Sequence, residues 1–266
     1  MLQLLQQRTK LSARIGKMKR RHGAVIYVPE RERELVARLM RVGNGQPPAR
    51  AVAALYREIL SSSRAAQGQA PIGLLRASAS LVLPAGRALF GACDQFSSSK
   101  TWAELVKDLD SGALSLALLT GGDLAGALRT GRQRHEFFSR LTVTADFAPM
   151  FEEKTPLARR IFVVTPRGNA PQPEAGRILI LIECKSTVNA IKTLLHFMPD
   201  LPIHAEQLAL RAARVKGGIG ATLTRLTLAR PVDGGSATSR LLAACQTAAI
   251  AVSILGIYPG TEDYGG

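Results

Sequence analysis

The sequence of 266 residues predicts a multidomain fold of the α + α/β class. An all-helical N-terminal bundle is expected first, then a partial α/β region, then a C-terminal ferredoxin-like domain. Three observations predict this. Apolar residues recur at helical spacing over residues 1–67. Residues 72–165 alternate short apolar runs with helical stretches, which is typical of α/β structure. Residues 177–262 follow the order strand, helix, strand, strand, helix, strand, which is typical of a ferredoxin-like unit.

The N-terminal part is expected to hold three helices, over residues 1–21, 29–43 and about 48–66. Pro29 is suited to the first position of the second helix. Residues 43–45, Gly-Asn-Gly, end that helix because their backbone is permissive. Residues 68–71, Gly-Gln-Ala-Pro, form a short linker to the α/β region.

Polar side chains interrupt the apolar stripes of these helices. Arg8 and Lys19 border the stripe of the first helix, and Arg31 and Glu32 lie in the first turn of the second. The first stripe consists of Leu4, Leu11, Ile15 and Met18. The stripe of the third helix changes from apolar to polar at intervals of four residues, through Leu55, Ile59, Ser63 and Gln67. These polar groups indicate a site inside a helical bundle, with a solvated basic surface as the alternative.

The α/β region and the last 90 residues are expected to contain shorter elements. In the region, these are strands at 72–75, 114–119 and 160–165, a helix to Phe90, and a helix from the capping box Thr101–Glu104 to about Asp110. Residues 130–160 show no clear pattern, and 165–176 read as a polar linker. In the last part, these are strands at 177–184, 202–212, 221–229 and 252–258, helices at 187–197 and 236–248, and a Gly217-Gly218 turn.

The composition is that of a globular protein, with 46% hydrophobic and 21% charged residues. No apolar run reaches the roughly 18 residues that cross a bilayer, so no membrane partner is expected. The three cysteines, Cys93, Cys184 and Cys245, are scattered and show no metal-type spacing. They are interpreted as reduced core residues of a cytoplasmic protein, and no metal is expected.

Positive charge is concentrated at the N-terminus. The net charge is +15, and residues 1–70 hold 14 Lys or Arg against 4 Asp or Glu. Such a bias favours anionic partners. Nucleic acid is one option, but the basic part has no recognised reader motif and few interleaved aromatic residues. A small dianion is the other option.

Three segments resemble a known family. LQLLQQR (2–8), IGKMK (15–19) and IYVPERE (26–32) are similar to the all-helical chorismate mutases, in particular to the mutase end of the bifunctional chorismate mutase–prephenate dehydratase proteins. The resemblance implies a cofactor-free rearrangement of chorismate, carried out by an interlocked homodimer. It also implies a further Arg from an earlier part of the first helix, which the family places in the partner's site and which this sequence does not show.

The resemblance assigns a role to each polar position. Arg8 and Arg31 would contact the substrate carboxylates. Lys19 and Gln67 would donate to the breaking ether oxygen. Glu32 would take the ring hydroxyl, and Ser63 would help to hold a carboxylate. Val28 stands where the family has an Asp close to that hydroxyl.

The rest of the chain resembles a prephenate dehydratase and its ACT regulatory domain in part. Residues 98–119, 123–128, 140–147 and 160–168 carry the dehydratase likeness, and LGIYPG (255–260) carries the ACT likeness. The family's second dehydratase lobe is missing, and its three motif strips fall on residues 76–82, 121–123 and 160–162 without their chemistry. No dehydratase activity is therefore expected. Val188 replaces a Gly that admits an amino-acid ligand, which argues against feedback by phenylalanine.

The sequence therefore favours a homodimeric chorismate mutase of phenylalanine biosynthesis that carries a degenerate dehydratase remnant. A non-catalytic regulatory or interaction protein of the same pathway is the alternative. Nucleic-acid binding through the basic N-terminal domain is a third and weaker hypothesis.

Overall fold

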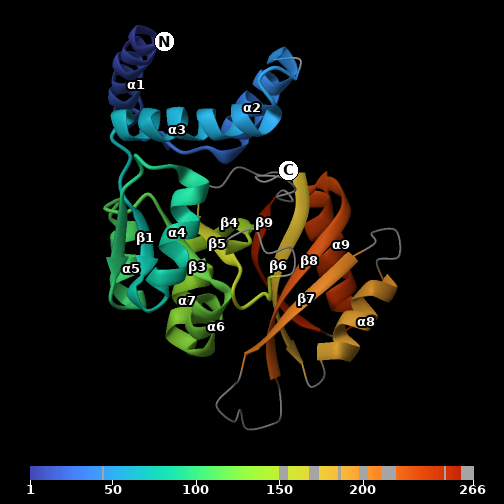
Figure 1. Cartoon of the computed structure of the whole chain (residues 1–266). Helices are drawn as coiled ribbons and strands as arrows, with labels where there is room; N and C mark the ends of the chain where they lie inside the picture. The colour runs from blue at the N-terminus through green and yellow to red at the C-terminus, as the bar shows by residue number, and fades with distance from the viewer. Residues whose placement is uncertain are drawn as a thin grey trace.

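The computed structural model describes residues 1–43, 45–149, 155–167, 174–184, 187–197, 203–210, 220–248 and 250–258. Three helices form one end of the molecule, and two sheet-containing parts lie side by side beneath them (Figure 1). This arrangement of a helical N-terminal part and a mixed α/β remainder confirms the predicted fold class.

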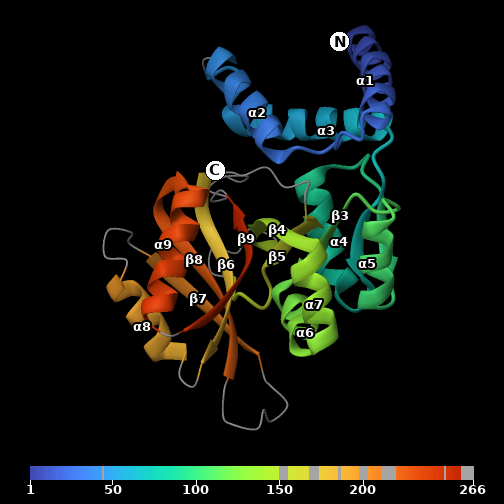
Figure 2. The same cartoon turned by 180° about the vertical axis from the view of Figure 1, so that it is seen from behind.

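The helical part consists of α1 (Leu2–Arg21), α2 (Pro29–Gly43) and α3 (Ala49–Gln67). The views from both sides show α3 lying across the top of the α/β parts, with α1 and α2 rising from its two ends (Figures 1 and 2). The contact between α1 and α3 is close because Gly16 has no side chain. A Cβ at Gly16 would lie 2.3 Å from the carbonyl oxygen of Gln67.

The apolar stripe of α1 is open to solvent in the single chain. Its four members, Leu4, Leu11, Ile15 and Met18, are between 47% and 68% exposed. The buried residues of α1 are instead the small Ser12 and Gly16, which face α3. Close approach through these small residues leaves the large apolar side chains of the stripe exposed on an adjacent face of the helix.

The middle part is a five-stranded sheet in the order β2-β1-β3-β5-β4. Its strands are β1 (Ile72–Leu75), β2 (Phe96–Ser99), β3 (Leu116–Thr120), β4 (Leu141–Phe147) and β5 (Ile161–Pro166). Its helices are η1 (Arg76–Ser78), α4 (Ala79–Phe90), α5 (Trp102–Asp110), α6 (Gly121–Arg129) and α7 (Gly131–Arg140). Strands β1, β2 and β3 are parallel, whereas β5 runs antiparallel to β3 and to β4.

The C-terminal part is a four-stranded antiparallel sheet in the order β7-β8-β6-β9, with two helices. Its elements are β6 (Glu174–Cys184), α8 (Thr187–Phe197), β7 (Ile203–Leu210), β8 (Gly220–Asp233), α9 (Gly234–Thr247) and β9 (Ala251–Tyr258). The predicted ferredoxin-like order is confirmed. Strand β8 runs on to Asp233, beyond the predicted end at residue 229. Residues 168–173 of the predicted linker and the Gly217-Gly218 turn lie outside the described residues, and residues 174–176 of that linker belong to β6.

The two sheets share one hydrophobic core. One face of the C-terminal sheet contributes Leu179, Leu181, Leu223 and Leu255 to the core that also contains Trp102 and Phe137 of the middle part. Its other face packs Ile178, Ile180 and Ile182 against α8 and α9. A Cβ at Gly256 would lie 2.1 Å from the carbonyl oxygen of Val143, so β9 and β4 come into close contact.

A buried charge cluster lies at the same junction. Asp146 of β4 is fully buried and forms ion pairs with Arg160, Arg177 and Arg225, which come from both parts. The Arg177 contact is 3.0 Å and the Arg225 contact is 2.7 Å. Burial by itself would raise the pKa of Asp146, but the three guanidinium charges lower it below the ordinary value. We interpret the cluster as a structural contact that stabilises the packing of the two sheets against each other.

Candidate functional site

The first group of predicted site residues lies where α1 passes α3. The Nε of Arg8 donates a hydrogen bond of 3.0 Å to the Oγ of Ser63. The Ser63 hydroxyl in turn donates to the carbonyl oxygen of Ile59 at 2.8 Å. Arg8 is half-buried, and its guanidinium has further N–H donors for an anion.

A small hollow lies beside this pair. It has a volume of about 200 Å³ and is lined by Leu5, Arg8, Thr9, Glu58, Ile59, Ser62 and Ser63. Ligand pockets in proteins usually enclose about 300–1,000 Å³. The hollow is therefore smaller than a usual complete site, and α1 and α3 of one chain form only part of a wall.

The second group gathers around the start of α2. The Nζ of Lys19 donates to the carbonyl oxygen of Ile26 at 3.0 Å, which fixes the ammonium near the chain that leads into α2. Partial burial and then the charge of Arg31 lower the pKa of Lys19, and the charge of Glu32 opposes this shift. Lys19, Arg31 and Glu32 therefore share one electrostatic environment.

Two further predicted residues lie close to these groups. Gln67 is the last residue of α3, and its side-chain oxygen is buried without a hydrogen-bond partner among the described residues. Its backbone oxygen accepts a hydrogen bond from Arg20. Val28 is half-buried, and its carbonyl oxygen accepts the backbone N–H of Glu32 at 3.2 Å. Among the described residues, no hydrogen bond joins the Arg8–Ser63 pair to the group around Lys19.

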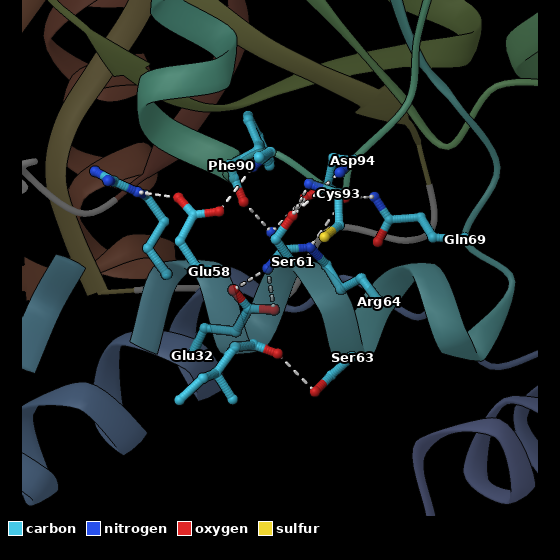
Figure 3. A network of polar contacts seen from close by, with 12 residues as sticks. Glu32, Glu58, Ser61, Ser63, Arg64, Gln69, Phe90, Cys93 and Asp94 are labelled. Atoms are coloured by element: carbon cyan, nitrogen blue, oxygen red, sulfur yellow. Dashed lines mark hydrogen bonds and ion pairs between the residues drawn. The ribbon is translucent and has the colours of Figure 1, made fainter. Parts of the chain in front are cut away.

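Glu32 has a partner that the sequence did not predict. Figure 3 shows the Arg64 side chain reaching from α3 to the Glu32 carboxylate on one side and to Asp94 on the other. The Nη1 of Arg64 lies 2.7 Å from Oε1 and 2.5 Å from Oε2 of Glu32. Burial raises the pKa of Glu32, and the charge of Arg64 opposes this shift.

The predicted site residues supply positive charge and donors that can bind carboxylates. Arg8, Lys19 and Arg31 supply cations, and Gln67 supplies a buried amide. The part of the chain that the structure describes holds no group of three or more His, Cys, Asp or Glu that could bind a metal ion. Such a site is suited to gripping a small anion and stabilising negative charge within it.

The comparison with protein families defines the class of the N-terminal part. Residues 1–68 match the family model described as chorismate mutase type II. The chain therefore carries a chorismate mutase type II domain at its N-terminus, formed by α1, α2 and α3.

A particular relative extends this likeness. The chain is 32% identical over 112 residues to a bifunctional chorismate mutase/prephenate dehydratase of Aquifex aeolicus (strain VF5). The match covers 41% of this chain and 30% of the relative, so the chain spans less than a third of that protein's length. The resemblance to such bifunctional proteins is confirmed.

The solved structures that resemble this chain share little sequence identity with it. They include GqqA, described as a novel type of quorum quenching acylase, at a TM-score of 0.47 and 16% identity, covering 73% of this chain and 96% of that one. The prephenate dehydratase of Streptococcus mutans gives 0.41 and 14%, with 71% and 97% covered. That of Staphylococcus aureus subsp. aureus Mu50 gives 0.44 and 12%, with 71% and 99% covered. TM-scores below 0.5 at these identities carry no functional conclusion for this chain.

Within the described residues, no helix combines the length and the apolar character that a membrane crossing requires.

Proposed function

We propose that the protein is a chorismate mutase, which rearranges chorismate to prephenate in the biosynthesis of phenylalanine. The match of residues 1–68 to the chorismate mutase type II model is the observation that carries this proposal. The geometry supports it, because α1, α2 and α3 each bring predicted substrate contacts toward the bundle. The relative from Aquifex aeolicus is named for the same activity in its mutase part.

The proposed reaction requires only binding and electrostatic stabilisation from these residues. The rearrangement is pericyclic and needs no nucleophile, metal or proton transfer. The protein has to hold two carboxylates in the reactive conformer and stabilise charge on the breaking ether oxygen. Arg8 and Arg31 take the carboxylates because a guanidinium binds a carboxylate through two hydrogen bonds. Lys19 and Gln67 face the ether oxygen, Ser63 supports a carboxylate, and Glu32 and the backbone of Val28 take the ring hydroxyl.

The site is proposed to form between two copies of the chain. The exposed stripe of α1, composed of Leu4, Leu11, Ile15 and Met18, is the surface that the partner covers. Soluble monomers rarely leave such a continuous apolar stripe in water. The hollow of about 200 Å³ beside Arg8 is enlarged and closed in the same step. A homodimer therefore accounts for both features.

We propose that the α/β part has no prephenate dehydratase activity. The three strips that carry the family's motifs are replaced in residues 76–82, 121–123 and 160–162. Purified protein incubated with prephenate should yield no phenylpyruvate above the buffer control. The product must be measured without an acid step, because acid dehydrates prephenate by itself. Protein-dependent phenylpyruvate formation would show that the α/β part is catalytic.

One observation favours the non-catalytic alternative, a regulatory or interaction protein of the same pathway. The Glu32 carboxylate is already bound by Arg64, so a substrate hydroxyl would have to share it. An assay of prephenate formation from chorismate separates the two functions. Conversion by the wild-type chain that is lost in Lys19→Ala supports the mutase. A folded wild-type protein that converts no chorismate supports the alternative.

A further inference from the structure

The Arg64 side chain connects the helical and the middle parts through several hydrogen bonds and ion pairs. It is 3% exposed, although it carries a permanent charge. Its Nη2 donates to the carbonyl oxygen of Phe90 at 2.5 Å and lies 2.7 Å from Oδ2 of Asp94. Its Nε lies 3.3 Å from Oδ1 of the same carboxylate. A buried charge of this kind is stable only when it is paired and its donors are used.

The Asp94 carboxylate is itself fixed to α3. It lies in the turn between α4 and β2, and it accepts a hydrogen bond of 2.7 Å from the hydroxyl of Ser61. That hydroxyl accepts the backbone N–H groups of Cys93 and Asp94 at 3.0 and 3.1 Å. Gly91 has a φ of +103°, and a Cβ there would lie 2.7 Å from Cβ of Ser61. The turn therefore approaches α3 at a distance that few other residues allow.

This anchoring leaves one end of the guanidinium to act on Glu32. Asp94 and Phe90 occupy Nε and Nη2, so Nη1 alone faces the Glu32 carboxylate. The guanidinium group of Arg64 also makes cation–π contacts with two aromatic rings. Its Cζ lies 5.5 Å from the centre of the Tyr27 ring and 5.8 Å from the centre of the Phe90 ring. Arg64 thus connects the middle part to the start of α2.

We propose that Arg64, anchored by Asp94 of the α/β part, is a positioning residue that orients Glu32 in the mutase site. This inference rests on the proposed function and deepens it. A carboxylate has about four acceptor positions, so the bonds from Nη1 leave Glu32 able to accept a substrate hydroxyl. The α/β part is then a structural requirement of the helical site, and its retention in the chain has a catalytic consequence.

The test compares Asp94→Asn with a control variant on α3, the helix that carries Arg64. Asn keeps the shape of Asp94 but removes the charge that holds Arg64. The KM for chorismate should rise about tenfold, with a smaller change in kcat, because a charge-assisted contact to the substrate hydroxyl is misplaced. Arg57→Gln is the matched control. Arg57 lies two turns earlier on α3 and donates to the carbonyl oxygen of Ala88 at 2.9 Å, and among the described residues no hydrogen bond or ion pair joins it to Glu32. Its KM should stay within about twofold of the wild-type value.

A double-mutant cycle shows whether the effect passes through Glu32. In a Glu32→Gln background, Asp94→Asn should change KM by less than about twofold, because the carboxylate that Arg64 positions is no longer present. If Asp94→Asn fails to fold, Arg64→Lys replaces it, since Lys keeps the charge but cannot bridge two carboxylates.

Each result decides between the hypotheses. A selective KM increase that disappears in the Glu32→Gln background supports the positioning role. An effect no larger than that of Arg57→Gln, or one that persists in full without Glu32, overturns it while leaving the mutase activity in place. A folded wild-type chain without mutase activity overturns the proposed function and this inference with it.

Discussion

At the scale of single residues, the predicted site residues fall into two contact groups. Arg8 and Ser63 are hydrogen-bonded, and Lys19 lies in the field of Arg31 and Glu32. Helical spacing and the family resemblance led to the prediction of these positions. Neither could select Arg64, because its ion pair with Asp94 joins residues 30 positions apart through a turn whose shape depends on Gly91.

Lys19 and Gln67 carry the most specific prediction at this scale. Replacing either one with Ala should reduce prephenate formation to the uncatalysed background. Each removes a donor to the ether oxygen, and loss of one such donor costs about 10²–10³ in rate. The measurement is kcat for chorismate, with circular dichroism as the control for folding. Full activity in both folded variants would remove these residues from the site.

At the scale of elements, a helix or strand was predicted well where residues typical of helix ends, such as proline and glycine, mark its bounds. The three N-terminal helices begin and end within about one residue of expectation, because Pro29, Pro48 and Gly68 stand at their ends. Strand β2 was missed because its sequence, FSSS, has no apolar alternation. Helix α6 was missed because its capping box uses Thr120 and Asp123, where Glu or Gln is the usual partner.

The strands around Asp146 give a prediction for acid stability. The pKa of Asp146 is lowered in the folded state, so its charge contributes stability above the unfolded pKa, near the ordinary 3.8. That contribution is lost as the pH falls below about 4 and through the folded pKa. Asp146→Asn should cost about 3–5 kcal/mol at neutral pH, because three arginines remain buried near a neutral group.

Urea unfolding at several pH values from 7 down to 3 measures both effects. The wild-type and Asp146→Asn curves of unfolding free energy should converge as the pH falls. A constant gap between them would mean that Asp146 does not titrate as the ion pairs predict.

At the scale of the whole molecule, the chain joins a helical part with an open apolar surface to two sheets with a closed common core. The two sheets bury apolar side chains against each other in the shared core, and the Asp146 cluster pairs buried charges from both. Among the described residues, no other element covers the stripe of α1 in this way. Self-association is therefore expected at the helical end.

We predict an obligate dimer whose melting temperature rises with protein concentration, because association stabilises the folded state by mass action. Light scattering at micromolar concentration should give the mass of two chains. Ile15→Glu places a charge in the stripe and should shift the mass toward one chain, whereas Lys17→Glu, a charge change at an exposed position of the same helix, should not. A wild-type monomer that keeps its helicity would contradict the dimer.

Dimeric chorismate mutase activity can be measured as prephenate formation from chorismate by the purified wild-type chain, followed together with molecular mass over a range of protein concentrations. We expect conversion above the uncatalysed background, with a specific activity that rises as the dimer fraction rises. A folded dimer that converts chorismate no faster than buffer would contradict it.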